Sequence, residues 1–209
     1  ARAADRAADT RRQAITSLGL LLPRHTGNTP VLDRIVTALL ALRHDADPDV
    51  RRDSLAALAQ GKHIASLLPR LRPVLLAAAG SRDRDERLAA VTALADSRDA
   101  QLNAALAKLA RDADSGVATA AYRQITYSVE HGSRSPDLAA VLLAQLRVPD
   151  RRPLALRLLV KLGDARAIPA LLADLTSSQP RVRHAALQGL GRFTDPRATA
   201  ALVTAVTGS

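Results

Sequence analysis

The stretch DPDVRRDSLAALAQ covers Asp47–Gln60, and QPRVRHAALQGLGR covers Gln179–Arg192. In each stretch a small residue follows the valine after four positions, and a leucine follows it after eight. Residues at i, i+4 and i+8 share one face of an α-helix, so both stretches predict a helix with the same buried stripe. A pattern that returns so far along the chain indicates an internal repeat.

The same kind of triplet recurs along the chain, with anchors 28 to 40 residues apart. The six triplets are Thr10, Ala14 and Leu18; Val50, Ser54 and Leu58; Glu86, Ala90 and Leu94; Val117, Ala121 and Ile125; Leu154, Leu158 and Leu162; and Val182, Ala186 and Leu190. The triplet of Leu154, Leu158 and Leu162 is a weaker match than the others. We therefore expect six anchored helices, which approach their neighbours closely where the middle residue is small.

Signals for helix starts precede several anchors. Asp47, Asp83 and Asp114 each lie three residues before an anchor, where a carboxylate can accept hydrogen bonds from the free N–H groups of a helix start. Pro48 and Pro180 suit the first helical position, where a missing N–H costs little. Second helices are expected between the anchored ones, over 30–43, 65–80, 100–112, 135–147, 167–175 and 198–206.

This arrangement resembles HEAT repeats of the armadillo-like type, in particular the short repeats of phycobilisome lyases. The resemblance rests on DADPDVRRDSLAAL, SSQPRVRHAALQGLG and GDARAIPALLADL, and on Leu67, Leu68 and Pro69. It covers essentially the whole chain and implies an all-α fold, a right-handed α-solenoid of about six HEAT-like hairpins, as one repeat domain over residues 1–209. An irregular all-α bundle is the alternative. Because the chain contains no methionine, we expect it to be a segment of a longer protein.

The sequence departs from the family pattern in the middle of the chain. Ala118 stands where the family has arginine, and the fifth repeat begins with Arg151, Arg152 and Pro153 without an aspartate cap. The regularity of the repeat is weakest there.

Four arginines follow their anchors by one residue and are expected to be structural. The resemblance implies a ladder in which Arg11, Arg51, Arg87 and Arg183 pair with aspartates of their own or a neighbouring repeat. Asp47, Asp83 and Asp114 are expected to form the acidic side of that ladder.

Basic residues outnumber acidic ones by 30 to 20, which gives a net charge of +10. Such a chain attracts acidic proteins, nucleic acid or anionic lipid. The cations are scattered, and the resemblance implies that the anchored helices line a concave face. Candidate partner-binding residues on these helices are Arg12, Arg52, Arg123, Arg157, Lys161, His184 and Arg192.

Catalytic and cofactor signals are weak. The absence of cysteine excludes thiol nucleophiles and thiolate metal sites, and the five histidines do not have metal-ligand spacing. Glu130 and His131 invert the His-Glu pairs of deoxyhypusine hydroxylase, a di-iron relative in architecture. We therefore expect neither an enzyme nor a metal or other cofactor. Aromatics are only 1% of the chain, which disfavours a DNA glycosylase-like site that stacks bases.

The leading hypothesis is a non-catalytic scaffold that binds a protein partner through its extended concave surface. The alternatives are nucleic-acid binding through a basic groove and an accessory or lyase-type role. No apolar run is long enough for a membrane span, and no signal peptide is evident. We expect a cytoplasmic location and no small-molecule substrate.

Overall fold

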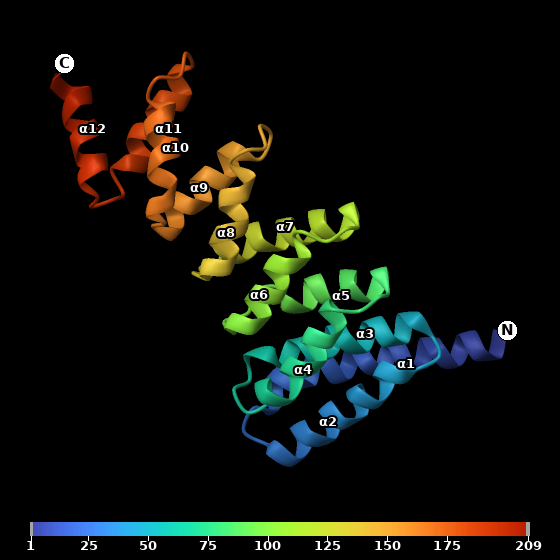
Figure 1. Ribbon diagram of the computed structural model, residues 1–209. Helices are drawn as coiled ribbons and strands as arrows, with labels where there is room; N and C mark the ends of the chain where they lie inside the picture. The colour runs from blue at the N-terminus through green and yellow to red at the C-terminus, as the bar shows by residue number, and fades with distance from the viewer. Residues whose placement is uncertain (1, 208–209) are drawn as a thin grey trace. The chain divides into compact units, whose positions relative to one another are not determined.

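The computed structural model describes the backbone of residues 2–207 and the side chains of residues 6–207. Within this range the chain forms twelve α-helices and no strand (Figure 1). The helices are α1 (Arg2–Leu21), α2 (Thr29–Ala41), α3 (Pro48–Ala59), α4 (Leu68–Ala79), α5 (Arg84–Leu94), α6 (Ala100–Leu109), α7 (Ser115–Glu130), α8 (Pro136–Gln145), α9 (Arg152–Leu162), α10 (Ile168–Asp174), α11 (Pro180–Leu190) and α12 (Pro196–Thr207). Odd-numbered helices carry the anchors and even-numbered ones are the expected second helices, so the α-solenoid of about six hairpins is confirmed.

The chain divides into two compact units, Ala1–Ser128 and Val129–Ser209. The division falls in the last turn of α7. It lies inside the stretch where the sequence departs from the family pattern. A single repeat domain over residues 1–209 stays a prediction, and so does the right-handed sense of the superhelix.

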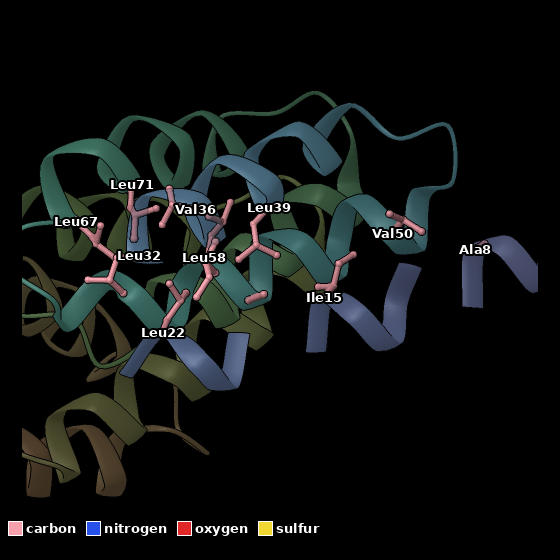
Figure 2. Close-up of a cluster of buried hydrophobic side chains, with 12 residues drawn as sticks. Ala8, Ile15, Leu22, Leu32, Val36, Leu39, Val50, Leu58, Leu67 and Leu71 are labelled. Atoms are coloured by element: carbon pink, nitrogen blue, oxygen red, sulfur yellow. The ribbon is translucent and has the colours of Figure 1, made fainter. Parts of the chain in front are cut away.

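The first unit is a stack of equivalent helices. α1 packs against α3, α3 against α5, and α4 against α6, while α2 and α4 cover the flanks of the anchored helices. The core between the first two hairpins is almost entirely aliphatic (Figure 2). Its side chains include Ile15, Leu22, Leu32, Val36, Leu39, Val50, Leu58, Leu67 and Leu71. Aliphatic side chains suffice because each layer of the stack is only one helix thick.

The aspartate caps are confirmed. The Asp47 side chain accepts from the N–H groups of Asp49 and Val50 at 2.8 and 3.2 Å. Asp83 and Asp114 make the same pair of bonds to the first turns of α5 and α7. These bonds satisfy N–H groups that have no partner within the helix, which sets where each helix begins.

The expected triplet is wrong in α1. Thr10 and Ala14 are exposed, whereas Ile15 is buried in the core of the first unit. A Cβ added at Gly19 would lie 3.0 Å from the Cβ of Ala57, so the absence of a side chain lets α1 approach α3. The buried stripe of α1 is therefore displaced by one residue from the triplet that the sequence indicates.

The second unit contains the end of α7 and helices α8–α12. α8 packs against α9, α10 packs against α11, and both α10 and α11 pack against α12. Arg151, the residue before α9, provides no side-chain cap, as expected, and Gly163, the residue after α9, has a φ of +70°. This left-handed backbone favours glycine and turns the chain sharply towards α10.

Candidate functional site

A groove of about 970 Å³ lies in the second unit, lined by α9 and α11 with two residues from α10. We call it the α9–α11 groove. One carboxylate, Asp174, is among its lining residues. The cationic side chains in the lining are Arg152, Arg157, Lys161, Arg181 and Arg192. The charge balance of the groove is therefore clearly positive.

The floor of the groove is apolar. Leu156 and Leu171 are buried, and Val160 and Val182 are half-buried beside them. A Cβ added at Gly189 would lie 2.8 Å from Leu171 Cδ2 and 3.4 Å from Val160 Cγ2. The glycine therefore lets α9, α10 and α11 meet closely at one end of the floor. No aromatic residue is among those lining the groove.

At one end of the groove, Arg152 and Asp174 form a two-pronged ion pair. The Arg152 Nη1 and Nη2 atoms donate to the two carboxylate oxygens at 2.9 and 2.7 Å. The hydrogen bonds to Asp174 hold the pKa of Arg152 above its usual value. Because this pair joins α9 to α10 and neutralises itself, Arg152 is a poor candidate for attracting a ligand.

Glu130, the last residue of α7, engages two further cations. Its carboxylate lies 2.6 Å from Arg157 Nη2, and its carbonyl oxygen accepts from Lys161 Nζ at 2.6 Å. A cation beside the last carbonyls of a helix is favourable because the partial negative charge of the helix gathers there. Arg157 and Lys161 therefore already have a partner within the second unit.

Arg181 and Arg192 differ from these three cations. Both side chains are exposed, and among the described residues neither takes part in a salt bridge. Arg181 lies in the first turn of α11, and Arg192 follows its last turn. Of the five cations that line the groove, these two remain open to a carboxylate or phosphate from outside.

The arginines of the expected ladder make regular contacts with backbone carbonyls. Arg51 Nη1 donates to the carbonyls of Asp45 and Ala46, which lie six and five positions earlier. Arg87 and Arg183 make the same pair of bonds to the carbonyls at the same offsets. Each of these arginines therefore fastens the turn before its own helix.

The carboxylates that meet this ladder differ from those expected. Arg11 pairs with Asp45 at 2.9 Å, and Arg87 pairs with Asp112 at 2.8 Å. Both acids lie two residues before a capping aspartate of the next hairpin. Asp47, Asp83 and Asp114 instead bind the N–H groups of their own helices, although Asp114 also accepts from Arg84.

Comparisons with known proteins agree with this architecture. Residues 139–209 match the family model of HEAT repeats, and this segment includes the α9–α11 groove. This segment of the chain therefore carries HEAT repeats. An engineered protein of known structure is similar over 93% of this chain and 92% of its own, with a TM-score of 0.52 at 19% sequence identity, and it has the same fold.

The archaeal HEAT-like repeats protein from Thermococcus onnurineus NA1 is also similar, with a TM-score of 0.46 and 16% identity over 85% of this chain and 79% of its own. No curated protein matches the sequence.

The HEAT hairpins bring only part of the predicted partner-binding set together. Arg157, Lys161 and Arg192 line the α9–α11 groove. His184 also lies on α11, but it is not among the lining residues, and its Nε2 lies 2.9 Å from the side-chain nitrogen of Gln188.

The other predicted residues belong to the first unit. Arg12 binds Asp53 at 2.7 Å, and this carboxylate raises the pKa of Arg12. Arg52 binds Asp49 at 2.8 Å. The Arg123 side chain is exposed and forms no salt bridge among the residues that the structure describes.

Arg152 and Arg181 are groove residues that the sequence did not indicate. Arg181 directly precedes Val182, the anchor of the sixth repeat, whereas the candidates were chosen from positions after the anchors. A helical wheel that included the first turn of each anchored helix would have found both residues. Among the side chains of residues 6–207, no group of three or more potential ligands could hold a metal ion. No helix within residues 2–207 is long and apolar enough to cross a membrane.

Proposed function

We propose that this HEAT-repeat chain is a non-catalytic scaffold that binds a protein partner through the α9–α11 groove. The observation that carries the proposal is a depression of about 970 Å³ with an apolar floor and cationic side chains around it, on two successive anchored helices. Apolar surface at the centre and polar groups around it are the usual arrangement of a protein interface. HEAT hairpins present such a surface on a framework that does not depend on the ligand.

The test uses a random peptide library displayed on phage and selected on the immobilised chain. Ala185 lines the groove and is exposed, so Ala185→Trp fills the groove without entering the core. Ala200→Trp places the same ring on an exposed position of α12 that is not among the lining residues. We expect selected peptides to bind the parent and Ala200→Trp but to lose affinity for Ala185→Trp.

An empty selection, or peptides that bind Ala185→Trp as well as the parent, would contradict the proposal. Circular dichroism and thermal melts of both variants serve as folding controls.

The second candidate is nucleic-acid binding through phosphate contacts, which the net charge of +10 favours. This binding should depend little on base sequence, and each phosphate contact on duplex DNA contributes about −0.9 to the slope of log affinity against log salt. Arg123→Glu and Arg157→Glu should weaken it and flatten the slope. Binding to neither duplex nor single-stranded DNA at low salt would eliminate this candidate.

A further inference from the structure

The cations of the α9–α11 groove fall into two classes by their partners. Arg152 is neutralised by Asp174, and Arg157 and Lys161 are held by Glu130. Arg181 and Arg192 are exposed, and among the described residues neither forms a salt bridge. The charge available to a ligand is therefore concentrated on two arginines, and neither is neutralised by the fold itself.

These two arginines flank the two ends of α11. The helix covers Pro180–Leu190, and at 1.5 Å per residue the backbone positions of Arg181 and Arg192 are about 16 Å apart. The apolar floor, with Val160, Val182 and Leu171, lies among the same lining residues. A ligand that uses the whole groove needs an apolar middle and negative charge towards both ends.

We propose that the ligand of the α9–α11 groove is an acidic protein segment, whose apolar side chains cover the floor and whose carboxylates bind Arg181 and Arg192. The inference rests on the proposed function and specifies the partner's chemistry. An arginine and a carboxylate match as planar groups that can form two parallel hydrogen bonds. The Arg152–Asp174 pair shows this geometry within the groove, with nitrogen–oxygen distances of 2.7 and 2.9 Å.

A nucleic acid fits the same surface less well. Single-stranded nucleic acids gain much of their affinity by stacking bases on aromatic side chains, and no aromatic residue lines the groove. A duplex presents charged phosphates at its surface. A duplex bound to the groove would therefore leave the apolar floor of the groove in contact with water or with phosphate charge. The floor therefore favours a protein segment over either form of nucleic acid.

The test extends the peptide selection with charge reversal at the two open arginines. Arg181→Glu with Arg192→Glu changes the net charge by the same amount as Arg134→Glu with Arg147→Glu, a control pair that is exposed in the second unit and absent from the groove. We expect the selected peptides to combine acidic and apolar residues. Their affinity should fall at least about tenfold for the groove pair, which is about 1.4 kcal/mol, and less than about twofold for the control pair.

Charge exchange provides the complementary measurement. Peptides in which lysine replaces the acidic residues should bind the parent weakly and regain affinity for the chain with Arg181→Glu and Arg192→Glu. The loss of affinity on charge reversal and its recovery with the lysine peptides should both diminish with added salt. Charges at the exposed edge of the groove are screened over about 8 Å at physiological ionic strength. If Arg192→Glu reduces stability because it places a negative charge just after the end of α11, Arg192→Gln is used in its place as a milder change.

The outcomes separate this inference from the proposed function. Neutral or basic peptides that lose binding to Ala185→Trp would overturn the acidic partner and leave protein binding in place. Peptides that are insensitive to Ala185→Trp would overturn both. A short DNA duplex that binds more tightly than any selected peptide, and is lost with the two arginine reversals, would replace the protein partner with nucleic acid.

Discussion

The small middle residue in the triplets of α7 and α11 limits how closely neighbouring helices can pack. Ala121 has no exposed surface and Ala186 is 1% exposed. Ala121→Trp or Ala186→Trp would force an indole ring between packed helices, and overpacking of this kind costs about 1–3 kcal/mol, sometimes more. We expect both variants to melt at a clearly lower temperature than the parent. Ala14→Trp is the matched control and should melt with the parent, because Ala14 is exposed.

Equal melting temperatures for all three variants would show that the inferred repeat core is wrong. A loss of stability in Ala14→Trp alone would instead restore the triplet that the sequence indicated for α1.

The turn before α12 contains an ion pair between Asp195 and Arg197 that depends on pH. Arg197 donates two hydrogen bonds to the Asp195 carboxylate and lowers the pKa of Asp195 from 3.8 to about 2. A carboxylate with a lowered pKa stabilises the folded state above its unfolded pKa, and this contribution disappears as the pH falls through the folded value. We expect the contribution of Asp195 to be complete above about pH 4 and to vanish towards pH 2.

The measurement is an NMR titration of the Asp195 carboxyl carbon in the parent and in Arg197→Gln. The midpoint should rise towards the ordinary aspartate value in the variant. A midpoint that does not change would show that the ion pair is not formed in solution.

At the scale of the element, glycine decides how near two helices can come. Gly19→Ala would place a Cβ 3.0 Å from the Cβ and 3.2 Å from the Cα of Ala57, and the backbone of α3 cannot move aside without disturbing the stack. Alanine otherwise favours a helix over glycine by about 1 kcal/mol, so a loss of stability here would run against the helix propensity.

We expect Gly19→Ala to lower the free energy of unfolding in chemical denaturation. Gly191→Ala is the control, because its Cβ would meet nothing nearer than 3.6 Å and its φ is −63°. That variant should be as stable as the parent or slightly more stable. A gain in stability at Gly19 would mean that α1 and α3 are not packed as closely as described.

At the scale of the whole molecule, HEAT hairpins contact mainly their neighbours, and stability is expected to vary along the chain. The boundary between Ser128 and Val129 and the uncapped start of α9 both lie between Gly116 and Pro153. We expect this stretch to exchange its amide hydrogens faster than the repeats on either side. Uniform protection across it and its neighbours, measured by hydrogen exchange with mass spectrometry, would contradict this expectation.

The sequence alone determined the hairpins, because their signals are local. A capping aspartate, a proline in the first turn and an i, i+4, i+8 stripe act within one or two helical turns, so Asp47, Pro48 and Val50 are enough to predict the start of α3. The register of α1 could not be predicted in the same way. Thr10 with Ala14 and Ile15 with Gly19 lie on adjacent stripes of one helix, and only packing against Ala57 of α3 decides between them.

The tertiary structure alone decided which cations are open to a ligand. Arg157 is 27 residues from Glu130, and Arg152 is 22 residues from Asp174, so no local pattern reveals that these charges are already paired. Arg181 and Arg192 stand apart only after the partners of the other cations are known. A charged side chain is open to a ligand only if the fold places no opposite charge within about 4 Å of it. Two residues that lie this close in space can be far apart along the chain.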